Sequence, residues 1–229
     1  MVRDSIGWLA VVLAGSAIVA QGQTSGRAPL GSTAESAESH RNPESRVFDT
    51  PSPIWEHGVG DGFRAGAFEA GLSLGPGIGM AILNSEQAHD LALASAQFGW
   101  MMTGPRGQHW YRGNWELMGE LFAGAQYRPD TDYVVGLGPA VRYNFATRSR
   151  WVPFMNVGGG FAATSIRGSD LSTTFEYQLQ AGVGTRYFLR PNLALTLEYR
   201  FLHISNAGID APNLGVNTSV IYAGFNYFF

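Results

Sequence analysis

From about residue 66 to the C-terminus, apolar and polar positions alternate along stretches of roughly 10 to 16 residues. A period of two is typical of a β-strand whose two faces meet different surroundings. Turn-forming residues such as Pro129-Asp130 and Pro191-Asn192 separate the stretches. We predict eight strands, at 66–80, 88–102, 110–127, 133–146, 151–164, 173–188, 193–204 and 216–229.

The character of the two faces indicates what surrounds this sheet. In the stretch 193–204, one face carries the bulky residues Leu193, Leu195, Leu197, Tyr199 and Phe201. The opposite face carries Ala194, Thr196, Glu198 and Arg200. Bulky faces with aromatics near their ends are typical of lipid-facing walls, and sparse charges mixed with small residues suit a narrow filled lumen. The fold class predicted is all-β, an eight-stranded antiparallel transmembrane β-barrel.

The last five residues, Phe225-Asn-Tyr-Phe-Phe229, form an alternating aromatic strand that ends with the chain. This ending resembles the C-terminal signature of bacterial outer-membrane barrels. We therefore expect the outer membrane as the location.

Charged residues fall on the predicted inner face of several strands. They are Glu116, Glu120, Arg142, Glu176, Arg186, Glu198 and Arg200. The interior of an eight-stranded barrel is only wide enough for side chains, so we expect these groups to pair with one another. This argues against a porin.

The N-terminal part of the chain has a different composition. Residues 1–22 contain Arg3, an apolar run and small residues at Ala20 and Gly22, which predicts a cleaved secretory signal peptide. Residues 23–62 are rich in Ser, Ala, Glu, Gly and Pro, which predicts a disordered or loosely docked segment. The barrel is assigned to 63–229.

Composition narrows the classes of function. Apolar residues make up 45% of the chain and charged residues only 14%, and the net charge of -3 argues against nucleic-acid binding. There is no cysteine, which excludes disulfides and thiolate sites, and no histidine has a ligand-spaced partner. We predict no metal and no cofactor.

One group of residues could carry chemistry. His203 and Ser205 lie two apart at the end of the seventh predicted strand, so they share a face, and parity places them on the lipid side. Counting back from Phe229 places Asn217 on the same side of the neighbouring strand. A serine needs an adjacent base to act as a nucleophile, and the histidine needs a third group to fix its tautomer. A His and a Ser at a strand end are also ordinary interfacial residues, so spacing alone leaves catalysis open.

The run His203-Ile-Ser205-Asn206-Ala207-Gly208, followed by Pro212-Asn213 and Gly215, resembles the lipid A 3-O-deacylase family. The resemblance implies an eight-stranded outer-membrane barrel with Ser205 as nucleophile and His203 as general base. It also implies the backbone N–H groups of Asn206 and Gly208 as candidates for the oxyanion hole.

The sequence departs from the family at the third catalytic position, where the family has Glu and this chain has Asn217. Asn can accept a hydrogen bond from the imidazole, but it cannot stabilise an imidazolium with a full charge. Asp210 could substitute if its loop folds back, and Glu198 is a poorer candidate because of its lumen parity.

We therefore expect an outer-membrane serine esterase that removes an ester-linked 3-hydroxyacyl chain from lipid A, with lipopolysaccharide in the outer leaflet as its partner. The alternatives are a non-catalytic structural or adhesin-like barrel and an acyl hydrolase acting on another lipid. A homodimer stays open.

Overall fold

The computed structural model describes residues 63–229. The expected signal peptide, 1–22, and the expected N-terminal segment, 23–62, lie outside the described residues. No helix among the described residues is long and apolar enough to cross a membrane.

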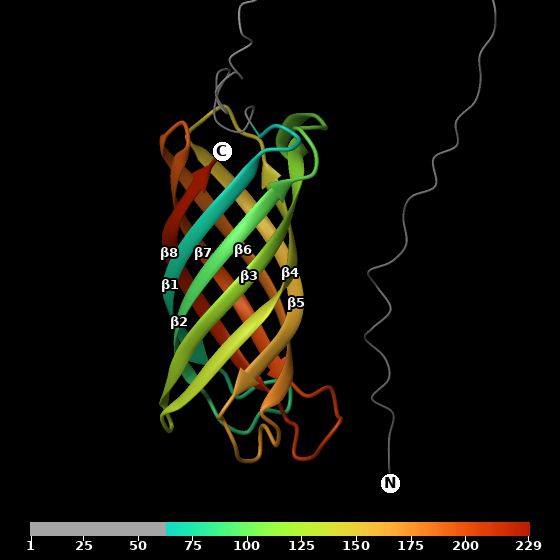
Figure 1. Cartoon of the computed structure of the whole chain (residues 1–229), viewed down its shortest axis with the longest axis vertical. Helices are drawn as coiled ribbons and strands as arrows, with labels where there is room; N and C mark the ends of the chain where they lie inside the picture. Colours follow the sequence, from blue (N-terminus) through green and yellow to red (C-terminus); the bar gives the residue numbers. More distant parts are fainter. Residues whose placement is uncertain (1–62) are drawn as a thin grey trace, which may run out of the picture. The chain divides into compact units, whose positions relative to one another are not determined.

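Eight antiparallel strands form a closed barrel in which each strand pairs with its neighbours in sequence and β1 pairs with β8 (Figure 1). The strands are β1 Phe68–Gly79, β2 Asp90–Met101, β3 Gly113–Arg128, β4 Asp132–Phe145, β5 Trp151–Thr164, β6 Phe175–Arg190, β7 Leu193–Ser205 and β8 Val216–Phe228. All eight predicted strands are confirmed. The third starts at Gly113 rather than 110, because His109–Tyr111 form a 3-10 turn.

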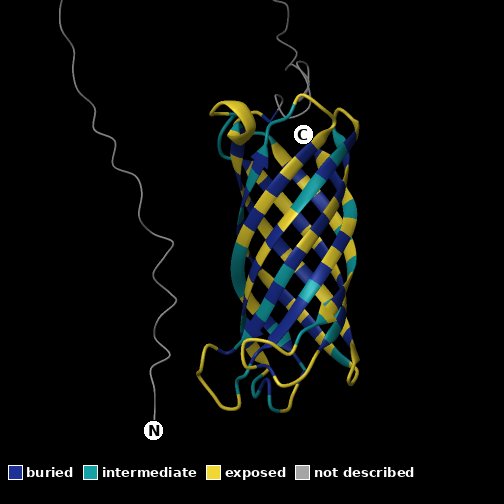
Figure 2. Cartoon of the chain, turned by 180° about the vertical axis from the view of Figure 1, so that it is seen from behind, coloured by how far each residue is buried: buried dark blue, intermediate teal, exposed yellow. Residues whose placement is uncertain are grey.

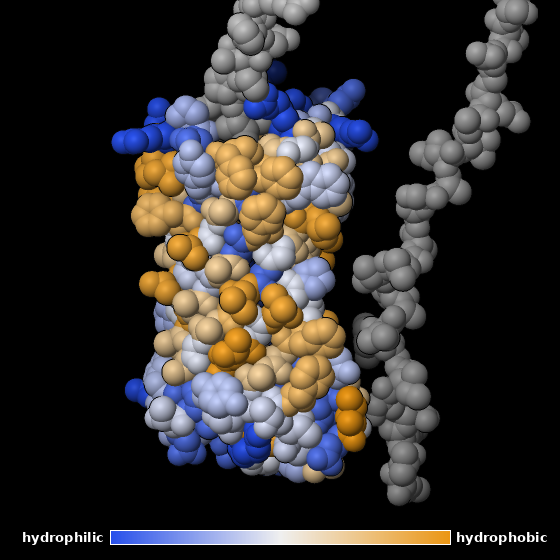
Figure 3. Space-filling view, in the orientation of Figure 1, coloured by the Kyte–Doolittle hydropathy of each residue, from blue (hydrophilic) through white to orange (hydrophobic). Residues whose placement is uncertain are grey.

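Burial alternates along every strand, as the sequence predicts (Figure 2). In β7, Leu197 is 55% exposed on the outer wall while its neighbour Glu198 is 2% exposed inside. On the face of the barrel that Figure 3 shows, apolar side chains gather over the middle and hydrophilic residues lie at both ends. Rings pair near one end, with centroids 4.8 Å apart for Trp115 and Tyr143 and also for Trp151 and Tyr187. Such a wall is that of a membrane-spanning barrel.

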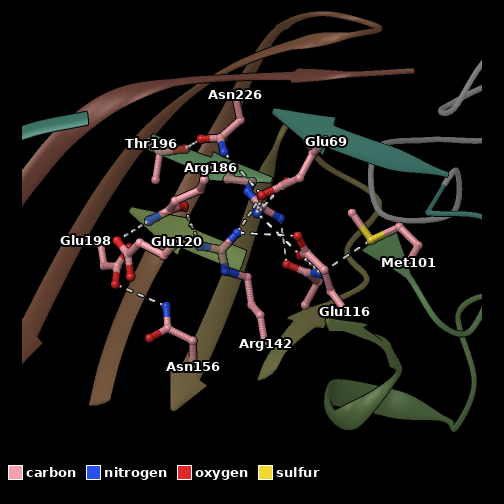
Figure 4. Close-up of polar contacts among 12 residues, drawn as sticks. Glu69, Met101, Glu116, Glu120, Arg142, Asn156, Arg186, Thr196, Glu198 and Asn226 are labelled. Carbon is pink, nitrogen blue, oxygen red and sulfur yellow. Dashed lines mark hydrogen bonds and ion pairs between the residues drawn. The ribbon is translucent and has the colours of Figure 1, made fainter. Parts of the chain in front are cut away.

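The middle of the lumen is filled by ion pairs (Figure 4). The Glu69 carboxylate accepts hydrogen bonds at 2.7 Å from both Arg142 and Arg186. Arg200 pairs with Glu120 at 2.6 Å and with Glu198 at 2.8 Å. These charges are almost fully buried, so removing one partner leaves an uncompensated charge at a cost of about 3–5 kcal/mol.

The predicted pairing of lumen charges is confirmed except at Glu176. This carboxylate accepts a hydrogen bond from Thr173 at 2.7 Å and forms no ion pair with an arginine of the described residues. It is the second residue of β6, ten residues before Arg186 on the same strand. Glu69, on the inner face of β1, is a further lumen charge that was not predicted.

Apolar side chains lie above and below the ion pairs and close the lumen at both ends. At the end where β1 begins, Phe63 contacts Phe188 and Phe228 edge to face, with ring centroids 6.0 and 5.6 Å apart. At the opposite end, Ile166 and Leu171 of the β5–β6 loop are buried in a cluster with residues of the strand walls. The barrel therefore has a packed core rather than a channel.

Candidate active site

The three residues singled out by parity come together at one end of the barrel. The register of β7 and β8 places His203 opposite Asn217, and Ser205 follows two residues after His203 on the same outer face. His203 Nε2 lies 3.0 Å from Ser205 Oγ, and His203 Nδ1 lies 2.7 Å from Asn217 Oδ1. These two contacts give the geometry of a nucleophile, a base and an orienting group.

The hydrogen bonds of Asn217 define the tautomer of His203. Asn217 Nδ2 donates to the Ile82 carbonyl at 2.7 Å, so Asn217 Oδ1 faces the imidazole. Because Oδ1 can only accept, His203 Nδ1 carries the proton. Nε2 then holds the lone pair that can receive the Ser205 proton.

Asn217 is buried although its side chain points to the outer wall. Only 1% of it is exposed, because the β1–β2 loop, residues 80–89, covers it. The loop begins as an extension of the sheet, since Met80 N–H donates to the Asn217 carbonyl at 2.8 Å. The imidazole and the serine are half-buried and remain accessible from the membrane side.

A glycine supports the imidazole from the β7–β8 loop, residues 206–215. Gly215 has a φ of 85°, and a Cβ built there would lie 2.8 Å from His203 Cε1. The position therefore needs glycine both for its left-handed backbone and for the space that the ring occupies.

Both N–H groups expected to form the oxyanion hole are hydrogen-bonded. Asn206 N–H donates to Asn213 Oδ1 at 2.9 Å, and Gly208 N–H donates to Asn206 Oδ1 at 3.0 Å. They lie one and three residues after Ser205, in a turn where Ala207 and Gly208 both have positive φ. For either group to bind an oxyanion, a side-chain oxygen has to give way.

The alternative acidic partners do not contact His203. Asp210 Oδ1 accepts a hydrogen bond from Ala211 N–H at 2.9 Å in the exposed loop. Glu198 lies in the lumen, paired with Arg200. The residue at the third position of the site is therefore Asn217.

The same end of the barrel holds a buried hydrogen bond between two ionisable side chains that was not predicted from the sequence. His89 Nε2 lies 2.9 Å from Asp170 Oδ2, and both residues are almost fully buried. Burial would raise the pKa of Asp170, but hydrogen bonds from Glu86 N–H, the His89 ring and Gln87 N–H outweigh it and hold that pKa below its ordinary value of 3.8. The pair joins loops 81 residues apart in sequence, so no local pattern could reveal it.

Two other features of the described barrel offer no second site. Within residues 63–229, no three His, Asp or Glu side chains lie close enough together to hold a metal ion. An apolar groove on the outer wall is lined by residues of β1–β3 and β5–β8, but it includes neither His203 nor Ser205. Lined mainly by lipid-facing side chains, it contacts the bilayer rather than the candidate site.

Comparisons with known proteins bear on the family and the fold of this chain. The family model of lipid A 3-O-deacylase (PagL) matches residues 92–226, more than half of the chain. No curated protein matches.

Two solved structures have the same fold. The outer membrane enzyme PagL is 18% identical, with a TM-score of 0.51 over 68% of this chain and 97% of its own. Neisserial surface protein A is 17% identical, with a TM-score of 0.52 over 72% of this chain and 99% of its own. At these identities, the likeness concerns the fold alone. Because the family model covers most of the barrel, including His203, Ser205 and Asn217, this chain belongs to the lipid A 3-O-deacylase (PagL) family.

Proposed function

We propose that this protein is a serine esterase of the bacterial outer membrane that removes an ester-linked 3-hydroxyacyl chain from lipid A. The observation that carries the proposal is the His203 imidazole, hydrogen-bonded at 2.7 Å to Asn217 and at 3.0 Å to Ser205 on the outer wall of the barrel. A lipid-side location favours a substrate whose ester bond lies in the membrane. Family membership supports lipid A of lipopolysaccharide as that substrate.

The proposed reaction has two steps. His203 Nε2 takes the Ser205 proton while Oγ attacks the ester carbonyl carbon, and the resulting oxyanion is bound by the N–H groups of Asn206 and Gly208 after their present acceptors move. The sugar oxygen then leaves with the proton from Nε2, and the acyl chain stays on Ser205. Water, deprotonated by Nε2, releases the fatty acid and regenerates the serine.

Asn217 has a more limited role than a carboxylate would have. Its Oδ1 keeps the proton of His203 on Nδ1, which leaves Nε2 free to act as a base. It brings no negative charge to the imidazolium that forms during the reaction, so we expect slower turnover than with Glu at this position.

The orientation in the membrane is part of the proposal. The first strand starts, and the last strand ends, at the barrel end opposite the site (Figure 1). With that end in the periplasm, Ser205 faces the outer leaflet, where lipopolysaccharide resides. Export through a cleaved signal peptide at 1–22 and a disordered or loosely docked segment at 23–62 belong to the same proposal.

A comparison of wild type with Ser205→Ala tests the function. Each protein is refolded in detergent, incubated with purified lipid A and analysed by mass spectrometry. We expect the mass of lipid A to fall by one hydroxyacyl group with wild type only. An unchanged mass with folded wild type would contradict lipid A deacylation and favour another lipid substrate or a non-catalytic barrel.

A further inference from the structure

A neutral amide at the third position creates a problem that a carboxylate does not have. Both oxygens of a carboxylate accept hydrogen bonds, whereas an amide has one accepting end and one donating end. If Asn217 turned over, its NH2 group would face His203 Nδ1 and move the imidazole proton to Nε2. His203 could then no longer accept the Ser205 proton, so the site needs a second group that fixes the amide.

The Ile82 carbonyl is that group. It accepts hydrogen bonds from Asn217 Nδ2 at 2.7 Å and from Ser85 N–H at 3.1 Å, and the latter closes a turn. The two central residues of this turn, Leu83 and Asn84, have φ values of 53° and 78°. A left-handed backbone is unfavourable for leucine, by about 1–2 kcal/mol, so contacts elsewhere have to maintain the turn.

Asp170 supplies these contacts from the β5–β6 loop. Its carboxylate accepts hydrogen bonds from Ser85 Oγ at 3.2 Å, Glu86 N–H at 2.8 Å and Gln87 N–H at 3.1 Å. The His89 ring also holds this carboxylate, with Nε2 2.9 Å from Oδ2, and Asp170 is only 2% exposed.

Asp170 also supports Asn217 from the other side. Its backbone carbonyl accepts a hydrogen bond from Gly215 N–H at 2.9 Å, two residues before Asn217. One residue thus connects the β1–β2 loop, which orients the Asn217 side chain, with the β7–β8 loop, which leads into the Asn217 backbone.

We propose that Asp170 is a positioning residue of the site: through the turn at 82–85 it holds the Asn217 amide in the one orientation that keeps His203 a base. With the amide held in this orientation, the neutral Asn217 can orient His203 as a carboxylate would. Its kinetic consequence rests on the proposed esterase function, but the orientation of the amide does not.

The kinetic test is a double-mutant cycle of Asp170→Ala and Asn217→Asp. Alone, D170A should lower kcat by about tenfold to a hundredfold, the range for a displaced catalytic group, and leave KM within about twofold. The carboxylate that N217D introduces has the shape of the amide but two accepting oxygens, so D170A should have little further effect in the N217D background. Equal loss of kcat in both backgrounds would overturn the proposal.

A spectroscopic test does not depend on turnover. In protein labelled with 15N-histidine, the ring nitrogens of His203, assigned by comparison with H203Q, should report a protonated Nδ1 in wild type. D170A should shift protonation toward Nε2, whereas D210A, which removes an exposed carboxylate of the β7–β8 loop, should not. An unchanged tautomer in folded D170A would refute the positioning role. If wild type itself fails to hydrolyse lipid A, the proposed function fails and the tautomer still decides the role of Asp170.

Discussion

The space around the His203 ring leads to a stringent prediction at Gly215. In Gly215→Ala, the new Cβ would lie 2.8 Å from His203 Cε1 and 3.3 Å from the Ile204 carbonyl oxygen. Carbon atoms pack favourably at about 3.5–4.0 Å, so the ring has to move by roughly 0.7 Å. Such a movement takes the 3.0 Å contact between Nε2 and Ser205 Oγ out of hydrogen-bond range. A misplacement of about 1 Å can cost a hundredfold in rate, so we expect G215A to reduce kcat by about tenfold to a hundredfold.

The matched control is Gly66→Ala. Gly66 has a φ of 87°, close to the 85° of Gly215, but a Cβ there meets no atom within 4 Å. Both substitutions carry a backbone cost of roughly 1–2 kcal/mol, and only G215A displaces the imidazole. The assay is acyl release from lipid A at saturating substrate, with folding checked by heat-dependent migration in SDS gels. Equal rates for G215A and G66A would refute the claim that the position of His203 limits the reaction.

Three further predictions concern the barrel and the Asp170 pair. Arg142→Met leaves buried carboxylates with one fewer partner, so it should lower the free energy of unfolding in urea by about 3–5 kcal/mol. The control is Arg128→Met at an exposed arginine, which should change this free energy by less than about 1 kcal/mol. Equal losses in the two variants would contradict a lumen held by ion pairs. Phe63→Ala removes a buried ring from the barrel end and should cost about 3–5 kcal/mol in the same assay; no change would show that the ring does not close the lumen. Because its pKa is depressed in the folded protein, Asp170 stabilises the fold above pH 3.8 and loses this contribution as the pH falls through the lower folded pKa. The urea midpoints of wild type and D170N should therefore differ at neutral pH and converge only below pH 3.8. Equal midpoints at neutral pH would contradict a stabilising role of the Asp170 carboxylate.

The strands could be predicted from the sequence because the bilayer imposes a strict rule. Every outward residue meets lipid and every inward residue meets the packed lumen, so alternation persists in strands such as β6 and β7. The same alternation holds in β1, where Glu69 lies on the inner face although it was not among the predicted lumen charges.

The candidate site was likewise predicted only in part. Parity was enough to place His203, Ser205 and Asn217 on one face of the sheet. His203 and Ser205 lie on the same strand, and Asn217 lies opposite His203 on the adjacent strand. The role of the loops could not be predicted. Asp170 meets Glu86 across 84 residues and Asn217 meets Ile82 across 135, and nothing in the local sequence of either loop specifies these contacts.

The depth of each charged residue along the barrel axis could not be predicted from the sequence either. Parity assigned charged residues to the interior but not their depth along the barrel axis. Glu176 was therefore expected among the ion pairs, although it lies near the barrel end and bonds to Thr173. Depth depends on strand register and tilt, which only the closed barrel defines.

The most direct test of the central claim is covalent labelling of Ser205 by an alkyl fluorophosphonate, which reacts with serines activated by a base. We predict that peptide mass spectrometry will find the label on Ser205 of wild type, and little or none on Ser205 of the folded variant His203→Gln. Absence of the label from Ser205 in folded wild type, or equal labelling of wild type and H203Q, would contradict a serine nucleophile activated by His203.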